Sequence, residues 1–215
     1  MAAKIEAVNA NKPSAWILKR AARLITRGEV IVCPTDTGYA LAANALDARA
    51  VVKVFNLKGR SYSNPIHVAV DSIGAAGKYA YLNRAALHLA RHFLPGALTL
   101  VLPKKEIISS LLVAGRDTIG IRIPDNKVIL ELAALTGLPL TATSANISGQ
   151  PTPYTAQEVV SQLGEAMADV ALVLDQGSLH PPGLSTIIDL TVDPPRLLRQ
   201  GRLSWEKICK VWQSL

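Results

Sequence analysis

The chain has 215 residues, which is enough for one sizeable domain with its own core and barely enough for two. Its formal net charge of +7 favours anionic partners such as nucleotides, RNA or acidic surfaces. The two cysteines, Cys33 and Cys209, stand far apart, and this spacing argues against a disulfide framework or a CxxC zinc site.

Targeting signals are also missing from the sequence. No apolar run approaches the roughly 20 residues that a membrane span needs, and the first residues lack the apolar stretch of a secretory signal. We therefore expect a soluble, cytoplasmic protein. No linker, repeat or low-complexity segment is visible, so we expect a single domain over residues 1–215.

The first half of the chain predicts helices and strands in turn. A helical recurrence of apolar residues ends at Gly28, and the β-rich run that follows it is ended by Pro34. Asp47 and Asn83 stand where they can cap two further helices. The elements expected up to residue 102 are helices over 13–27, 47–57 and 83–94 and strands over 30–33, 39–43, 66–70 and 97–102.

The second half adds more strands than helices. Thr155 and Glu158 form a capping box for one helix, and Ser204 can cap the last one. Further helices are expected over 128–135 and 155–163, and strands over 118–123, 138–143, 170–174, 184–190 and 196–198. Because several strands follow one another directly, we expect an α/β fold with a mixed, twisted sheet covered by helices.

Two short segments far apart in the sequence point to nucleotide chemistry. Lys58 and Arg60 flank a glycine where a helix is expected to end. Ser144 and Asn146 lie in a turn rich in Thr, Ser, Asn and Gly, just after an apolar strand. Together they could hold a polyphosphate from two sides, with charge from one segment and hydrogen bonds from the other. Taken singly, each pair also fits a solvated helix end or an ordinary turn.

Arg122 lies in the alternating run Thr118-Ile-Gly-Ile-Arg-Ile-Pro124. A strand here places Thr118, Gly120 and Arg122 on one face and three isoleucines on the other. An arginine fixed on a strand is well placed to meet a carboxylate with two parallel hydrogen bonds. The polar loops over 34–38 and 141–149 follow strand ends, where ligands usually bind.

Other common motifs are absent. The sequence has no P-loop, no GxGxxG fingerprint and no GxSxG elbow. His88 and His92 have metal-ligand spacing on an expected helix, but no acidic third ligand accompanies them, which favours a plain surface pair.

The chain resembles the YrdC family, the threonylcarbamoyl-adenylate synthases of tRNA modification. The resemblance covers about residues 14–203 and rests on eight motifs in order: Pro34-Thr-Asp-Thr37, Lys58-Gly-Arg60, Asn64-Pro65, Leu94-Pro-Gly-Ala-Leu-Thr99, Ile121-Arg-Ile-Pro124, Thr143-Ser-Ala-Asn-Ile-Ser-Gly149, Ser185-Thr-Ile-Ile-Asp189 and Leu198-Arg-Gln-Gly201. It implies a three-layer α/β domain around a basic cavity.

The resemblance also implies an activity and its partners. Family members join L-threonine, bicarbonate or CO2, and ATP into threonylcarbamoyl-AMP and release pyrophosphate. Partner proteins then pass the threonylcarbamoyl group to adenosine 37 of tRNA. Mg2+ would be held through the phosphates, with no protein ligand to the metal. Direct binding of tRNA or other RNA is a further expectation.

By the same resemblance, the site residues divide into two groups. The residues implied to contact ATP are Lys58, Arg60, Asn64, Thr118, Ala142, Ser144, Asn146 and Arg199. Among them Lys58, Arg60, Ser144 and Asn146 would carry catalysis. The residues implied to hold threonine are Thr37, Arg122 and Ser185.

This sequence departs from the family pattern near the threonine residues. Many members have a histidine where Ala69 stands, and His67 lies one strand period earlier, on the same expected face. The motif after the Pro-Thr loop reads Gly38-Tyr39-Ala40. These changes leave open a YciO-like paralogue or a basic RNA-binding module with weak or no synthase activity. The fold of dihydroxybutanone-phosphate synthases ranks lower, because no acidic metal-binding loop is present.

Overall fold

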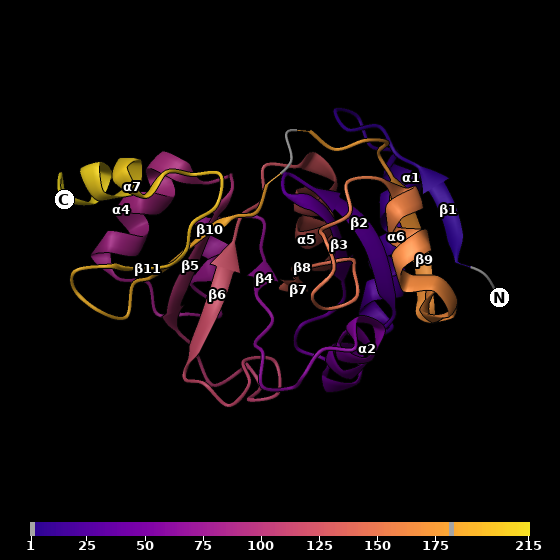
Figure 1. The fold of residues 1–215 in the computed structure, drawn as a ribbon, viewed down its shortest axis with the longest axis horizontal. Helices are drawn as coiled ribbons and strands as arrows, with labels where there is room; N and C mark the ends of the chain where they lie inside the picture. The colour runs from indigo at the N-terminus through magenta and orange to yellow at the C-terminus, as the bar shows by residue number, and fades with distance from the viewer. Residues whose placement is uncertain (1–2, 181–182) are drawn as a thin grey trace.

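The computed structural model describes residues 3–180 and 183–215, which form two β-sheets covered by helices (Figure 1). The first sheet has five strands in the order β1-β9-β2-β3-β8. β1, β9 and β2 run parallel, and β3 and β8 are antiparallel to their neighbours. The strands are β1 (Lys4–Ala7), β2 (Val30–Thr35), β3 (Gly38–Ala42), β8 (Thr143–Ser144) and β9 (Val170–Asp175).

The second sheet has six strands in the order β11-β10-β5-β6-β4-β7. β10 pairs with β5 and β6 pairs with β4 in parallel, and the other pairs are antiparallel. The strands are β4 (Val68–Ala69), β5 (Leu98–Pro103), β6 (Thr118–Arg122), β7 (Leu140–Thr141), β10 (Thr186–Asp189) and β11 (Arg196–Arg199). The expected α/β fold with mixed pairing is confirmed, and the strands are divided between two sheets.

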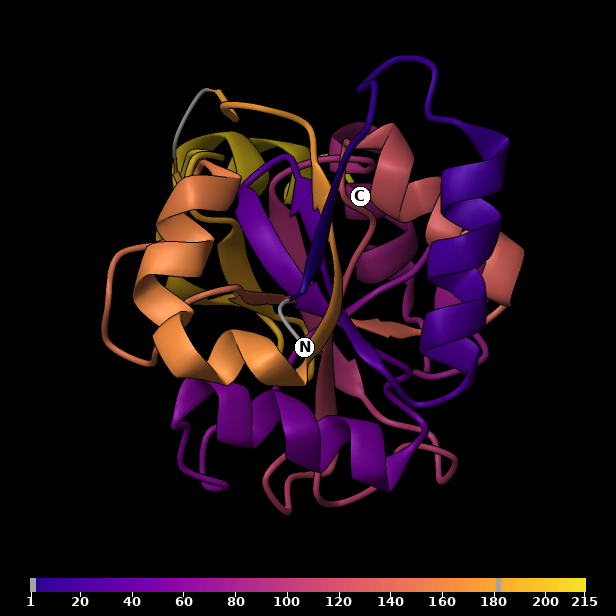
Figure 2. The ribbon, with the colours of Figure 1, turned by 90° about the vertical axis from the view of Figure 1, so that its right-hand side faces the viewer.

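Helices cover the first sheet on both faces. Figure 2 shows α1 and α5 together on one side of it and α6 on the other, with α2 across its lower end. Figure 1 shows α4 and α7 together at the end that carries the C-terminus. The helices are α1 (Ala15–Thr26), α2 (Ala48–Lys58), α3 (Ile73–Ala76), α4 (Arg84–Phe93), α5 (Lys127–Thr136), α6 (Ala156–Leu163), the 3-10 helix η1 (Gly164–Asp169) and α7 (Trp205–Trp212).

The core is shared between the sheets. One cluster of buried side chains includes Val32 and Leu41 from the first sheet and Leu100 and Ile121 from the second. Alternate residues of β2, such as Ile31, face a second cluster beneath α1 and α5. β2 is therefore buried on both faces, which is why its sequence is an unbroken apolar run.

The expected helix caps are confirmed. Asp47 accepts a hydrogen bond from the amide of the second helical residue of α2, and Asn83 caps α4 in a similar way. Thr155 and Glu158 form the full capping box of α6. Ser204 caps α7, whose residue Ile208 is fully buried. These caps use donors that the first turn of a helix otherwise leaves without partners.

Two predicted boundaries were wrong. β2 does not stop at Pro34 but continues to Thr35, so the expected loop over 34–38 is only a two-residue turn. Pro34 faces Tyr39 across the hairpin, and the Tyr39 amide donates to the Pro153 carbonyl instead, so this pair needs no N–H from proline.

The expected strand over 138–143 is split. β7 belongs to the second sheet and β8 to the first, and the chain crosses between the sheets at Ala142. There the Ala142 amide donates to the His67 carbonyl at 2.8 Å. The strand over 66–70 is reduced to β4, and the elements β1, α3 and η1 were not predicted. No described helix combines the length and the apolar character needed to traverse a lipid bilayer.

Candidate functional site

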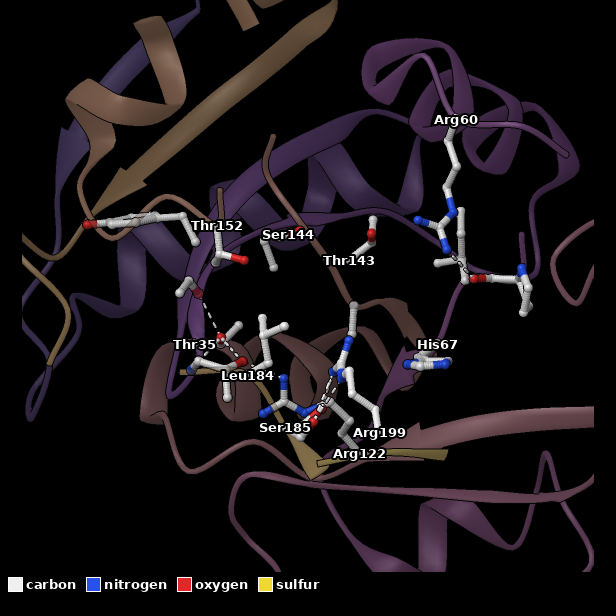
Figure 3. A pocket seen from close by; sticks show the side chains of 17 residues that line it. Thr35, Arg60, His67, Arg122, Thr143, Ser144, Thr152, Leu184, Ser185 and Arg199 are labelled. Carbon is white, nitrogen blue, oxygen red and sulfur yellow. Dashed lines mark hydrogen bonds between the residues drawn. The ribbon is translucent and has the colours of Figure 1, made fainter. Parts of the chain in front are cut away.

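A cavity of about 140 Å³ lies where residues of the two sheets face each other (Figure 3). Its walls come from the β2–β3 hairpin, the segment after α2, the crossing at Ala142 and the ends of β6, β10 and β11. Arg60, Arg122 and Arg199 line it, and the described residues that line it include no Asp or Glu. Positive walls of this kind attract anions.

Arg122 is the most buried of these arginines, with 6% of its surface exposed. Its Nη2 donates to Asp36 Oδ1 at 2.7 Å, and its Nη1 donates to Thr37 Oγ1 at 2.6 Å. Its Nε is buried and has no partner among the described residues. Burial lowers the pKa of Arg122, and the Asp36 carboxylate opposes that shift.

The expected division of β6 into two faces is confirmed. Ile119, Ile121 and Ile123 are buried in the shared core, and Arg122 lines the cavity on the opposite side. Gly120 lies beneath the ring of His67, because a Cβ atom there would be 2.5 Å from His67 Cδ2. A glycine is therefore what allows an imidazole to lie against this strand.

Arg199 and Ser185 form a second polar group beside Arg122 (Figure 3). The guanidinium of Arg199 donates to the Ser185 carbonyl at 2.9 and 3.1 Å and to Ser185 Oγ at 3.0 Å. The hydroxyls of Ser185 and Thr99 lie 2.9 Å apart. Burial lowers the pKa of Arg199, and the positive charge of Arg122 adds to that effect.

Lys58 lies behind the cavity wall and is 1% exposed. Its Nζ donates to the Ser144 carbonyl at 2.5 Å, the Asn146 carbonyl at 2.9 Å and Asn146 Oδ1 at 2.8 Å. Burial, helped by the charge of Arg60, lowers the pKa of Lys58 to about 7. The hydrogen bonds of Lys58 join the two predicted polyphosphate segments directly, and Ser144 Oγ donates to the same Asn146 Oδ1 at 2.6 Å.

Arg60 follows the left-handed Gly59 (φ 54°), which ends α2 and turns the chain toward the cavity. Its Nε donates to the Asn64 carbonyl at 3.1 Å, and its Nη2 donates to the Pro65 carbonyl at 3.0 Å. Arg60 thus braces its own turn while it lines the cavity.

The structure brings most of the predicted site residues together. Seven line the cavity: Thr37, Arg60, Arg122, Ala142, Ser144, Ser185 and Arg199. Lys58 and Asn146 are buried behind its wall. Asn64 is exposed and contributes its carbonyl, and Thr118 lies at the far end of β6 opposite Pro103. Neither of these two lines the cavity.

His67 lines the cavity, and Ala69 is fully buried in β4. Burial, together with the positive charges of Arg199, Arg122, Arg60 and Arg116, lowers the pKa of His67 to about 3. The imidazole is therefore neutral at physiological pH and can accept a hydrogen bond in a cavity lined by cationic donors.

Sequence reasoning gave no role to Asp36, although it stood inside a quoted motif. The signal was available in that motif, since a carboxylate between two threonines is a natural partner for a buried arginine. Thr35, Thr143 and Thr152 also line the cavity and were not singled out.

His88 and His92 lie one turn apart on α4, with ring centroids 4.7 Å apart. The described residues contain no group of three or more His, Cys, Asp or Glu side chains that could hold a metal ion. The two histidines make hydrogen bonds to nearby backbone instead: His88 Nε2 lies 3.0 Å from the Val211 carbonyl, and His92 Nδ1 lies 2.9 Å from the His88 carbonyl.

Comparison with known proteins shows where this arrangement occurs. A family model called Sua5_yciO_yrdC and described as "Telomere recombination" matches residues 23–201. The threonylcarbamoyl-AMP synthase of Pyrococcus abyssi is 40% identical over 197 residues, which are 91% of this chain and 57% of that protein. A putative threonylcarbamoyl-AMP synthase of Methanocaldococcus jannaschii is 39% identical over 186 residues, 86% of each chain.

A solved structure agrees with these sequence relatives. The crystal structure of P. abyssi Sua5 complexed with L-threonine superimposes with a TM-score of 0.91 at 38% identity. The match covers 96% of this chain and 60% of that one. This chain thus spans little more than half the length of its relative from P. abyssi.

Proposed function

This chain belongs to the Sua5/YciO/YrdC family, and from that premise we propose that it is an L-threonylcarbamoyladenylate synthase. It makes threonylcarbamoyl-AMP and pyrophosphate from L-threonine, bicarbonate or CO2, and ATP. The observation that carries the proposal is the meeting of two anion-binding groups in one cavity: Arg122 with Thr37 and Ser185 on one side, and Arg60 with Ser144 on the other.

The first group suits an amino acid. Arg122 offers a fixed, buried guanidinium to the α-carboxylate, and Thr37 and Ser185 place hydroxyls beside it. A neutral His67 can accept a hydrogen bond from the amine or hydroxyl of threonine. Support also comes from the likeness to the P. abyssi protein that was crystallised with L-threonine.

The second group suits the phosphates of ATP. Arg60 supplies charge, and the loop held by Lys58 presents Ser144 beside Ala142. A cavity of about 140 Å³ is smaller than the roughly 300–1,000 Å³ of a typical ligand site, so the nucleotide extends from it toward the surface. Contacts of ATP with Asn64, Thr118, Asn146 and Arg199 remain predictions.

The reaction needs positioned substrates and no protein nucleophile. The amine of threonine attacks CO2 and loses a proton, and a carbamate oxygen then attacks the α-phosphorus of ATP. The bond from the α-phosphorus to the bridging oxygen breaks, and pyrophosphate leaves with the electron pair. Arg60 and Ser144, which line the cavity, stabilise the charge that develops on the phosphates, and Lys58 and Asn146 hold the loop that positions Ser144. Mg2+ held through the phosphates of ATP would neutralise part of their charge and would need no carboxylate cage from the protein.

The cellular setting forms part of the same proposal. The product is handed to partner proteins that modify adenosine 37 of tRNA, and the +7 charge of the chain suits contact with RNA. The location that we propose for this activity is the cytoplasm. The core shared by the two sheets supports one domain over the described residues.

The test is an assay of the purified chain with ATP, Mg2+, bicarbonate and L-threonine. Pyrophosphate release should depend on threonine and bicarbonate, and mass spectrometry should detect threonylcarbamoyl-AMP. Arg122→Ala should abolish the product, Arg60→Ala should lower its rate of formation about 100-fold, and Arg196→Ala, which removes an arginine outside the cavity, should retain it. Pyrophosphate release that ignores threonine would contradict the proposal.

A second candidate is a paralogue with weak or altered activity. The observation that favours it is Ala69, a methyl group buried where many family members carry a histidine. The same assay decides between the two, because a paralogue would turn over ATP weakly or with another amino acid. Salt-dependent tRNA binding without ATP turnover would favour an RNA-binding module.

A further inference from the structure

The two-residue turn between β2 and β3 presents an acidic side chain to the cavity's most buried arginine. Asp36 and Thr37 form this turn, and Asp36 Oδ1 lies 2.7 Å from Arg122 Nη2. Both side chains of the pair are less than one-tenth exposed. A buried ion pair of this kind is costly to assemble and is weak evidence for stability. Its placement at a binding cavity therefore calls for a role there.

Arg122 keeps donors in reserve. A guanidinium has five N–H groups, and Asp36 and Thr37 use one each on Nη2 and Nη1. The N–H of Nε is buried without a partner among the described residues. Nη1 and Nη2 each keep a second N–H, and a carboxylate ligand in the cavity would supply acceptors for these two.

The charge balance leaves room for that ligand. Arg122 and Arg199 lie side by side in Figure 3, and Asp36 contributes one negative charge to the pair. Two cations against one carboxylate leave a net positive site. Arg202 on the Asp36 turn adds to this excess of positive charge, and a carboxylate ligand would reduce it.

The turn that carries Asp36 is held in a single arrangement by its own hydroxyls. Thr35 Oγ1 donates to the Gly38 carbonyl at 2.7 Å and accepts the Thr37 amide at 3.1 Å. Because the Thr35 proton is committed to Gly38, the contact of 3.2 Å between the hydroxyls of Thr35 and Thr37 has Thr37 as its donor. Thr37 Oγ1 is thereby oriented to accept from Arg122.

A second arginine clamps the turn from the far end of the chain. Arg202 Nη1 donates to the Asp36 carbonyl at 2.6 Å. The aliphatic stem of Arg202 lies against Gly183, where a Cβ atom would be 2.6 Å from Arg202 Cγ. Arg202 therefore joins the segment after β11 to the hairpin of the first sheet.

Resting on the proposed function, we propose that Asp36 is a positioning residue for the amino-acid substrate, and that Arg202 holds Asp36 in place. Asp36 fixes the orientation of the Arg122 guanidinium, so that the donors left over meet the substrate carboxylate without rearrangement. Without Asp36, Arg122 loses a charged partner and is free to change rotamer. Asp36 does not contact the reacting atoms.

The experiment measures L-threonine binding by calorimetry and steady-state pyrophosphate release in wild type, Asp36→Ala, Asp36→Asn and Arg202→Met. Asp36→Ala should raise the Kd and KM for threonine at least 10-fold and leave the KM for ATP and kcat within 2-fold. Asp36→Asn keeps an acceptor oxygen and should recover part of the loss. Arg202→Met should raise the KM for threonine about 3-fold. When Asp36→Ala is already present, adding Arg202→Met should raise it by a smaller factor.

The matched control is Asp189→Asn, which removes another mostly buried carboxylate that pairs with an arginine, outside the cavity. It should alter thermal stability and leave the KM for threonine unchanged. Tighter threonine binding by Asp36→Ala would overturn the inference, because Asp36 would then be a plug that competes with substrate. An unchanged KM would overturn it too. A wild type that does not bind threonine would instead refute the proposed function, and the two failures are thus distinct.

Discussion

Arg122 and Lys58 are both buried cations held by segments far away in sequence, but the protein uses their hydrogen-bonding capacity differently. All three N–H groups of Lys58 point to oxygens of Ser144 and Asn146. Arg122 gives two of its five N–H groups to the β2–β3 turn and keeps the rest. Lys58 has no N–H group left for a ligand, whereas Arg122 has N–H groups left to donate to one.

This difference separates two ways of building an anion site. On the side proposed for the phosphates, the buried ammonium of Lys58 shapes a loop, and the half-buried Arg60 lines the cavity. On the amino-acid side, one buried arginine both faces the cavity and takes its orientation from a neighbouring carboxylate. Substitution of Lys58 should therefore lower both the stability and the activity of the protein. Substitution of Arg60 should lower mainly the activity.

The largest effect is expected for Lys58→Met. The substitution removes the ammonium group and leaves three oxygens of the Ser144–Asn146 loop without their hydrogen-bond donors. Each buried acceptor left unpaired costs about 1–3 kcal/mol. We expect a loss of about 3 kcal/mol or more in the free energy of unfolding, together with at least a 100-fold fall in kcat. Denaturant melts and pyrophosphate release measure the two effects. A variant that loses activity at wild-type stability would show that Lys58 acts on the ligand alone.

Arg60→Ala should separate the two effects. Its two hydrogen bonds go to carbonyls of its own turn, which is partly exposed, so the free energy of unfolding should fall by less than about 1 kcal/mol. The kcat/KM for ATP should fall about 100-fold, because a charge at the phosphates is lost. Arg49→Ala, on the exposed face of the same helix, is the matched control for removing one positive charge. If Arg60→Ala lost as much free energy of unfolding as Lys58→Met, the proposed difference between the two residues would be wrong.

The halves of the site also differ in how well the sequence predicts them. Arg122 could be placed from one strand, because the alternation of Thr118-Ile-Gly-Ile-Arg-Ile fixes which face it occupies. Lys58 could be placed at the end of α2 from its cap and its glycine. Lys58 lies behind the cavity wall and Arg60 lines the cavity because of how the loops pack together. No local sequence pattern predicts this difference.

The division of the strands between two sheets could not be predicted from the sequence either. The run over 138–143 reads as one strand by alternation and composition, yet it crosses from one sheet to the other at Ala142. That break depends on the hydrogen bond from Ala142 to His67, 75 residues earlier in the chain by the printed numbering. Asp36 was missed for a similar reason, since its partner lies on another strand of the other sheet.

Gly120→Ala tests whether the amino-acid side depends on close packing. The added Cβ would lie 2.5 Å from the His67 ring, so the imidazole must move into the cavity or β6 must shift. We expect a loss of about 1–3 kcal/mol in the free energy of unfolding and a rise of about 10-fold in the KM for threonine, with the KM for ATP less affected. Gly74→Ala on α3, where the added Cβ would make only an ordinary contact of 3.9 Å with Ser72 Oγ, is the control. An unchanged KM would show that His67 does not bear on threonine.

A further test concerns the pH dependence of stability that His67 adds between the two halves of the site. Burial, together with Arg199 and Arg122, lowers its pKa in the folded protein to about 3, whereas the unfolded chain binds the proton near 6.5. Between these values the unfolded state holds more protons, so stability falls as the pH drops from 6.5 toward 3, by at most about 1.4 kcal/mol per pH unit. His67→Gln removes this loss. Its unfolding free energy should therefore decline less than that of wild type between pH 6.5 and 4.5, with His92→Gln on the exposed face of α4 as the control for losing a histidine. Parallel declines in wild type and His67→Gln would mean that the imidazole is protonated inside the cavity, and the arginines would then have to be further from it than the structure has them.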